Sequence, residues 1–124
     1  MQVKITTNSL LSQGDIEDLK KRLIDLGIND VFLRSNNKID VYNCIKEKYG
    51  IADKQVLYMG DDIPDIPVLQ VAGVSCCPQD AAIDVKQVVD YHSPLEGGKG
   101  CVREVIEQTL RVQGKWLNAN AFQW

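Results

Sequence analysis

Two hydrophobic patterns alternate along the chain. Short apolar runs, rich in β-branched and aromatic residues, predict strands. Longer segments with apolar residues three or four positions apart predict helices that bury one face. The predicted strands are residues 3–7, 31–33, 55–59, 74–77 and 88–91, and the predicted helices are residues 15–26, 38–49, 64–73, 81–87 and 101–113.

The regular alternation of strands and helices predicts the fold class. Parallel strands need a crossover connection, which is usually a helix. The pattern therefore predicts a three-layer, doubly wound α/β fold with a mostly parallel five-stranded sheet. We expect a single domain over residues 1–114, followed by a C-terminal tail, residues 115–124, that has no helical stripe.

Local signals mark helix ends and buried faces. Gly50 follows the second predicted helix and predicts a left-handed ending there. Pro64 is expected in the first turn of the next helix, where its missing N–H does no harm. In the last helix, the side chains expected to point inward are Val102, Val105, Ile106 and Leu110.

Composition excludes several function classes. The chain has 14 Lys and Arg against 17 Asp and Glu, a net charge of −3, which is the opposite of the basic character typical of nucleic-acid binding. No stretch approaches 18 unbroken apolar residues, and the first residues do not resemble a signal peptide. We therefore expect a cytoplasmic protein with neither a nucleic acid nor a membrane as its partner.

The cysteines predict no metal site. Cys44, Cys76, Cys77 and Cys101 form no C-x-x-C pair, and His92 is the only histidine. A Cys/His zinc site needs closely spaced ligands, which this pattern lacks. Because free cysteine is among the most often buried residue types, we expect four reduced, structural thiols.

Ligands of doubly wound sheets bind beyond the carboxyl ends of the strands. This rule selects candidate positions before any motif is considered. The segments that follow predicted strands are residues 7–9, 34–38, 60–62, 78–80 and 97–100.

The strongest signal is an acidic turn with three carboxylates, Asp61, Asp62 and Asp65, after the third predicted strand. One interpretation is helix capping, with Asp61 or Asp62 as the N-cap and Asp65 favourably placed in the first turn. The other is a Mg²⁺ site, because Mg²⁺ takes one or two carboxylates together with waters and substrate phosphate oxygens. Both interpretations stay open from the residues alone.

Lys38 and the segment after the first strand are candidate phosphate ligands. Lys38 is either a solvated surface charge or a point charge for a phosphate. Thr7 and Asn8 form either a plain turn or a set of donors for phosphate oxygens. The glycine-rich loop with Gly98 and Lys99 is either a flexible connection or a close approach of backbone to substrate.

These segments, in this order, resemble the haloacid dehalogenase superfamily of phosphohydrolases. More narrowly, they resemble its small, capless, tetrameric branch that acts on 3-deoxy-D-manno-octulosonate 8-phosphate in lipopolysaccharide biosynthesis. The resemblance covers nearly the whole chain from about Val3, and it is carried by residues 57–65 (LYMGDDIPD), 97–104 (GGKGCVRE), 114–116 (GKW) and 121–124 (AFQW).

The resemblance implies a Mg²⁺-dependent sugar-phosphate phosphatase that forms a homo-tetramer. Asp61 matches the family's metal-binding aspartate, and Asp62 matches its neighbour in the metal shell. Lys38 matches the lysine that holds the phosphate, and Thr7, with Asn8 beside it, matches the threonine that binds the phosphoryl group. Lys99, next to Gly98, stands where the family often has an arginine in its substrate loop.

The chain also departs from the family pattern. The family's first motif is an Asp-x-Asp segment that supplies the nucleophile and the general acid/base, and no Asp-x-Asp triplet occurs in these 124 residues. Catalytic residues are therefore predicted to be absent, and we expect the chain alone to have negligible phosphatase activity. Either an upstream segment supplies the motif, or the chain is a non-catalytic, truncated homologue that binds phosphate or forms oligomers.

The missing motif also changes the predicted sheet. In the family, the strand that carries the Asp-x-Asp motif is the central strand of the sheet. If the gap left by this missing strand closes, residues 3–7 pair with residues 55–59. The strand order then becomes 2-1-3-4-5, as in flavodoxin-like folds. If the gap stays open, the bare strand edges favour pairing with another chain.

Overall fold

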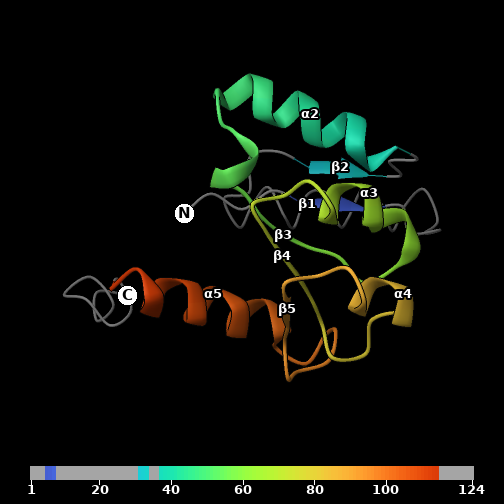
Figure 1. Cartoon of the computed structure of the whole chain (residues 1–124), viewed down its shortest axis with the longest axis vertical. Helices are drawn as coiled ribbons and strands as arrows, with labels where there is room; N and C mark the ends of the chain where they lie inside the picture. Colours follow the sequence, from blue (N-terminus) through green and yellow to red (C-terminus); the bar gives the residue numbers. More distant parts are fainter. Residues whose placement is uncertain (1–4, 8–30, 34–36, 115–124) are drawn as a thin grey trace. The chain divides into compact units, whose positions relative to one another are not determined.

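The structure is a computed structural model that describes residues 5–7, 31–33 and 37–114 (Figure 1). Contacts divide the chain into two compact units, residues 1–50 and residues 51–124, and each is described by itself. The helix predicted at residues 15–26 and the tail of residues 115–124 lie outside the described residues. Among the described helices, none combines the length and the apolar character needed to cross a bilayer.

The first unit contains two parallel strands and a helix. Strand β1 (Ile5–Thr7) pairs with β2 (Val31–Leu33), so that Thr7 lies opposite Leu33. Helix α2 (Lys38–Tyr49) begins after Asn37, whose side chain accepts a hydrogen bond from the Asp40 N–H. It ends at Gly50 with φ of 62°, which confirms the predicted left-handed ending.

The second unit is built on a parallel three-stranded sheet of order β3-β4-β5. Its strands are β3 (Leu57–Met59), β4 (Val74–Cys77) and β5 (Tyr91–His92). Between β3 and β4 lie η2 (Ile63–Asp65) and α3 (Ile66–Leu69), and α4 (Ile83–Lys86) lies between β4 and β5. The short helix η1 (Asp53–Gln55) precedes β3, and α5 (Cys101–Val112) follows β5.

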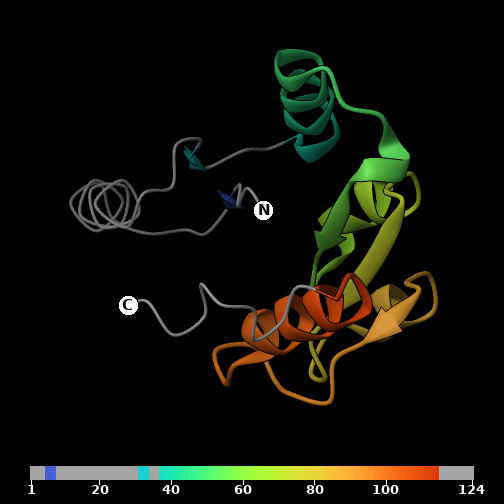
Figure 2. The same ribbon diagram turned by 90° about the vertical axis from the view of Figure 1, so that its left-hand side faces the viewer.

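Helices cover both faces of this sheet. Side chains alternate between the two faces along a strand, so Met59 and its partner Cys76 share one face, and Tyr58 and Cys77 lie on the other. Helix α5 lies on the first face, where the Cys101 thiol contacts the Met59 sulfur at 4.0 Å (Figure 2). On the second face, α3 and α4 pack around a core of Leu69, Cys77, Ala81 and Val85. This arrangement confirms the α/β class with helices on both sides of a parallel sheet.

Several predicted bounds differ from the structure. The helix predicted at residues 64–73 is divided into η2 and α3, because Pro67 has no N–H to donate, and it ends at Leu69, after which the Gly73 N–H bonds to the Asp53 carbonyl. The last strand is Tyr91–His92, since Val88 and Val89 pack on the core instead of continuing the sheet. In α5, Val102 is 54% exposed, and Cys101 and Val105 are the buried pair because residues four apart share a helix face.

The five described strands form two sheets, β1-β2 and β3-β4-β5. These pairings are part of the predicted order 2-1-3-4-5. The single continuous five-stranded sheet stays a prediction.

Candidate functional site

The acidic turn after β3 is organised by the buried carboxylate of Asp65. This side chain is 2% exposed and accepts three hydrogen bonds. The Tyr58 hydroxyl donates to Oδ1 at 3.1 Å, and the backbone N–H groups of Asp61 and Asp62 donate to Oδ2 at 3.0 and 3.2 Å. Asp65 therefore fixes the backbone of the two residues that the sequence predicts as metal ligands.

Gly60 makes this arrangement possible. A Cβ atom at Gly60 would lie 2.4 Å from the Cβ and 2.7 Å from the Cγ of Asp65, which is far inside van der Waals contact. Only glycine lets the backbone pass this close to the Asp65 side chain. The Gly60 N–H also bonds to the Cys76 carbonyl at 3.1 Å, so the turn starts directly from the sheet.

The side chains of Asp61 and Asp62 are both exposed. Asp62 is the N-cap of η2, where its Oδ1 accepts from the Ile63 N–H at 2.8 Å, so the capping interpretation is confirmed for Asp62. The Asp61 carbonyl accepts from the Ala82 N–H at 3.0 Å, which ties the turn to the segment after β4. Capping uses one carboxylate oxygen of Asp62, and it does not exclude a cation at the turn.

The carboxylates of the turn fit an open magnesium site. Among the residues that the structure describes, no group of three or more His, Cys, Asp or Glu side chains is placed to hold a metal ion. A closed protein cage is therefore absent from that part of the chain. Mg²⁺ needs only one or two carboxylates when waters and substrate phosphate complete its shell, and exposed Asp61 and Asp62 meet that requirement.

The glycine-rich loop between β5 and α5 is turned rather than extended. Gly98 and Gly100 have φ of 72° and 95°, and the Lys99 N–H bonds to the Glu96 carbonyl at 3.0 Å. The Lys99 side chain is exposed. The Gly97 N–H donates to Asp80 Oδ1 at 2.8 Å, which holds the loop against the end of β4. The loop is therefore anchored, and its lysine faces solvent.

The predicted phosphate ligands lie in the first unit. Thr7 is the last residue of β1, and Lys38 is the first residue of α2 and is partly buried. Thr7 thus stands at the carboxyl end of β1, and Lys38 follows the carboxyl end of the parallel strand β2 along the chain, as the sequence predicts. Asn8 lies outside the described residues. The meeting of Thr7, Asn8 and Lys38 with the acidic turn stays a prediction.

Sequence reasoning missed the role of Tyr58 and Asp65. The prediction placed Asp65 in the first turn of a helix, where it favours the helix dipole. Its position four residues after Asp61 was a signal that its side chain reaches back to the N–H groups of the turn. Tyr58 gave no comparable signal, because a tyrosine within a strand is most often only a packing residue.

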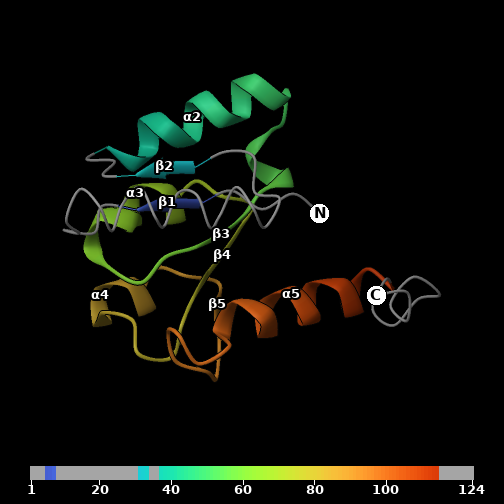
Figure 3. The ribbon, with the colours of Figure 1, turned by 180° about the vertical axis from the view of Figure 1, so that it is seen from behind.

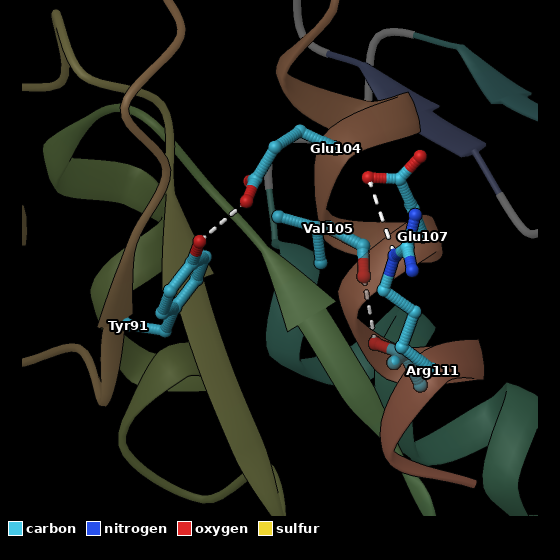
Figure 4. A network of polar contacts seen from close by, with 6 residues as sticks. Tyr91, Glu104, Val105, Glu107 and Arg111 are labelled. Atoms are coloured by element: carbon cyan, nitrogen blue, oxygen red, sulfur yellow. Dashed lines mark hydrogen bonds and ion pairs between the residues drawn. The ribbon is translucent and has the colours of Figure 1, made fainter. Parts of the chain in front are cut away.

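A second polar contact links β5 to α5, on the face that α5 covers. The Tyr91 hydroxyl donates a hydrogen bond to Oε1 of Glu104 (Figure 4), while the buried Oε2 has no hydrogen-bond partner among the residues that the structure describes. The hydrogen bond to Glu104, together with burial, raises the pKa of Tyr91 from 10.0 to about 12. Burial, followed by the neighbouring thiols and Glu104, raises the pKa of the Cys76 thiol from 9.0 to about 12.

Cys76, Cys77 and Cys101 are buried and free, as predicted, whereas Cys44 is free but exposed on α2. The prediction of a structural thiol is therefore wrong for Cys44. Cys44 lies two residues after Tyr42, the buried residue of α2. Residues two apart point to different sides of a helix, so Cys44 points away from the buried side.

Comparison with known proteins identifies the class of this α/β fold. The sequence profile of a family described as haloacid dehalogenase-like hydrolases matches residues 9–103. The chain belongs to this family. The matched region includes the acidic turn and the whole glycine-rich loop with its lysine.

Particular relatives are 3-deoxy-D-manno-octulosonate 8-phosphate phosphatases. The chain is 36% identical over 107 residues to that of Haemophilus influenzae, covering 86% of this chain and 59% of the relative. It is 36% identical over 97 residues to that of Escherichia coli K12, covering 78% of this chain and 52% of the relative. The chain thus spans between half and three fifths of the length of these two relatives.

Solved structures of such phosphatases share the fold. The cobalt-bound Haemophilus influenzae enzyme matches this chain with a TM-score of 0.86 at 32% identity. The match covers 98% of this chain and 68% of the enzyme's chain. The Moraxella catarrhalis enzyme, in complex with magnesium ion, phosphate ion and KDO, has a TM-score of 0.83 at 28% identity, with coverages of 94% and 64%.

Proposed function

We propose that this chain forms the metal- and phosphate-binding part of a Mg²⁺-dependent phosphatase that acts on 3-deoxy-D-manno-octulosonate 8-phosphate or a related keto-sugar phosphate. The observation that carries the proposal is the acidic turn after β3, in which Asp65 fixes the backbone of Asp61 and Asp62. The turn belongs to a sequence that is 36% identical to such a phosphatase. A cytoplasmic, homo-tetrameric enzyme is part of the same proposal and rests on family resemblance.

Each predicted site residue has a role in this proposal. Asp61 and Asp62 hold Mg²⁺, which supplies positive charge for the phosphate oxygens when it is bound. Lys38 contributes a permanent positive charge to the phosphate, and Thr7 and Asn8 donate hydrogen bonds to it. Gly98 and Lys99 contact the sugar part of the substrate, where the exposed ammonium group suits the carboxylate of an octulosonate.

The proposal assigns no nucleophile to these 124 residues, because they contain no Asp-x-Asp triplet. We therefore propose that the chain by itself releases no phosphate. The test incubates the purified chain with Mg²⁺ and the sugar phosphate and measures inorganic phosphate, with Asp61→Asn as the matched control. Equal, background release by both is expected, and steady release above the Asp61→Asn background would contradict this part.

The coding DNA upstream of Met1 separates the phosphatase from a non-catalytic module. An in-frame Asp-x-Asp segment is expected, and a protein expressed with that segment should hydrolyse the sugar phosphate and lose this activity in Asp61→Asn. A stop codon with no such segment before it would favour the alternative, a homologue that binds phosphate or forms oligomers without catalysis.

A further inference from the structure

The segment between β4 and α4, residues 78–82, contacts both loops of the candidate site. On one side, the Ala82 N–H donates to the carbonyl of Asp61 in the acidic turn at 3.0 Å. On the other side, the Gln79 N–H donates to the Leu95 carbonyl at 2.9 Å, and Asp80 Oδ1 accepts from the Gly97 N–H at 2.8 Å. The segment therefore bridges the acidic turn and the glycine-rich loop. Figure 3 shows the surrounding elements from behind.

Of these three bonds, only the one made by Asp80 depends on a side chain. The other two join backbone groups, so any residue except proline could donate them. The Gly97 N–H that Asp80 holds lies two residues before Lys99.

The loop needs such an anchor. It contains two glycines with positive φ, Gly98 and Gly100, and glycine gives a chain more conformational freedom than any other residue. The bond from the Lys99 N–H to the Glu96 carbonyl closes the turn internally but does not attach it to the sheet. Asp80, which follows β4, attaches the loop to the sheet through the Gly97 N–H, two residues before Lys99.

We propose that Asp80 is a positioning residue that holds the loop of Gly97, Gly98 and Lys99 in place for an anionic keto-sugar. This inference rests on the proposed function, in which Lys99 meets the carboxylate of the sugar. Asp80 acts through the loop and does not itself touch the substrate. Removing it should loosen the loop and leave the acidic turn unchanged, because Ala82 bonds to Asp61 through backbone groups alone.

The test compares four forms of the full chain: the wild type, Asp80→Ala, Asp80→Asn and Asp84→Ala. The amide of Asn keeps an oxygen that can accept from the Gly97 N–H, so Asp80→Asn should restore the anchor. Asp84 is an exposed aspartate on α4, and its replacement makes the same change of net charge away from the loop. Asp80 is exposed, so its variants should fold, which circular dichroism checks.

Two readouts are needed. Amide hydrogen exchange measures the loop, and we expect exchange of the Gly97 N–H to accelerate about tenfold in Asp80→Ala only. Titration with 3-deoxy-D-manno-octulosonate, followed by the amide NMR shifts of residues 97–100, measures ligand binding. We expect about tenfold weaker binding in Asp80→Ala, and wild-type behaviour in Asp80→Asn and Asp84→Ala.

Each other result has a distinct meaning. Unchanged exchange at Gly97 in Asp80→Ala would overturn the anchor, and a faster exchange with unchanged sugar affinity would reduce Asp80 to a structural role. If the wild type binds no octulosonate, the sugar-binding role of the loop fails with the proposed function. The exchange measurement would then still decide whether Asp80 anchors the loop.

Discussion

The Tyr58 hydroxyl and the Asp65 carboxylate, seven residues apart in the chain, meet at 3.1 Å behind the acidic turn. Tyr58 lies in the strand that leads into the turn, and Asp65 lies in the short helix that leaves it. The contact therefore joins the two ends of the turn. The remaining Asp65 oxygen is directed to the N–H groups of Asp61 and Asp62.

We expect Tyr58→Phe to lower the free energy of unfolding by about 1–2 kcal/mol, because the buried carboxylate loses a donor. Asp65→Ala should cost more, about 2–4 kcal/mol, since it leaves the hydroxyl and two N–H groups without their acceptor. Urea denaturation measures both values. Asp65→Asn is the matched control, because its amide oxygen keeps an acceptor. Equal stability of Tyr58→Phe and the wild type would mean that the contact contributes nothing.

Gly60→Ala tests the close approach at the start of the turn. The new methyl group would lie 2.4 Å from the Asp65 Cβ, so the turn must move, and we expect a loss of about 1–3 kcal/mol in stability. Gly97→Ala is a suitable control, because there the nearest atom, Asp80 Oδ1, would lie 3.5 Å away. Thermal unfolding compares the two variants. A Gly60→Ala protein as stable as Gly97→Ala would contradict the described packing.

Glu104→Gln tests the buried contact between β5 and α5. The glutamine oxygen can accept from the Tyr91 hydroxyl, while the buried oxygen without a partner becomes an uncharged amide group. Burying a charge costs more than burying a neutral polar group, so we expect stability to rise by up to about 1 kcal/mol. Glu104→Ala removes the acceptor as well and should be less stable than Glu104→Gln in urea denaturation. A Glu104→Gln protein less stable than the wild type would show that the charge itself stabilises the protein.

The pH dependence of stability above neutrality follows from the raised pKa values of Tyr91 and Cys76. A group whose folded pKa lies above its unfolded value stabilises the folded state fully below the unfolded pKa, and this contribution is lost as pH rises. For Tyr91 the loss runs from pH 10.0 to about 12, and for Cys76 from 9.0 to about 12. We expect the free energy of unfolding to fall across this window, and to fall less steeply in Tyr91→Phe. Identical slopes would show that Tyr91 titrates alike in both states.

Much of the architecture could be predicted from the sequence, because it depends on local signals. The apolar run at residues 74–77 predicted strand β4, and Gly50 predicted the end of α2. The alternation of strands with helices predicted the order of elements that the structure contains. Bounds that depend on tertiary contacts were less accurate. The strand predicted at residues 88–91 moved because Val88 and Val89 pack on the core of α3 and α4 rather than continuing the sheet.

The candidate site, too, could be predicted only in part. The strand-end rule located Asp61, Asp62 and Lys99 in loops that follow strands, because that rule depends only on the direction of the chain. Asp65 and Asp80 were not recognised as residues that hold these loops, since each acts through a hydrogen bond that exists only in the folded chain. A three-residue spacing can indicate an N-cap, but no spacing indicates a contact between residues 80 and 97.

The proposed function requires that a cation bound by Asp61 and a phosphate bound by Lys38 lie in one site, and this requirement stays a proposal. If they do, each ligand must raise the affinity of the other by the same factor. The most direct test is therefore to titrate inorganic phosphate into the chain with and without Mg²⁺, using NMR, in the wild type, Asp61→Asn and Lys38→Ala. We predict that Mg²⁺ strengthens phosphate binding about tenfold in the wild type, that this enhancement is lost in Asp61→Asn, and that phosphate binding is lost in Lys38→Ala. Phosphate affinity that does not respond to Mg²⁺, or that responds equally in Asp61→Asn, would contradict the shared site.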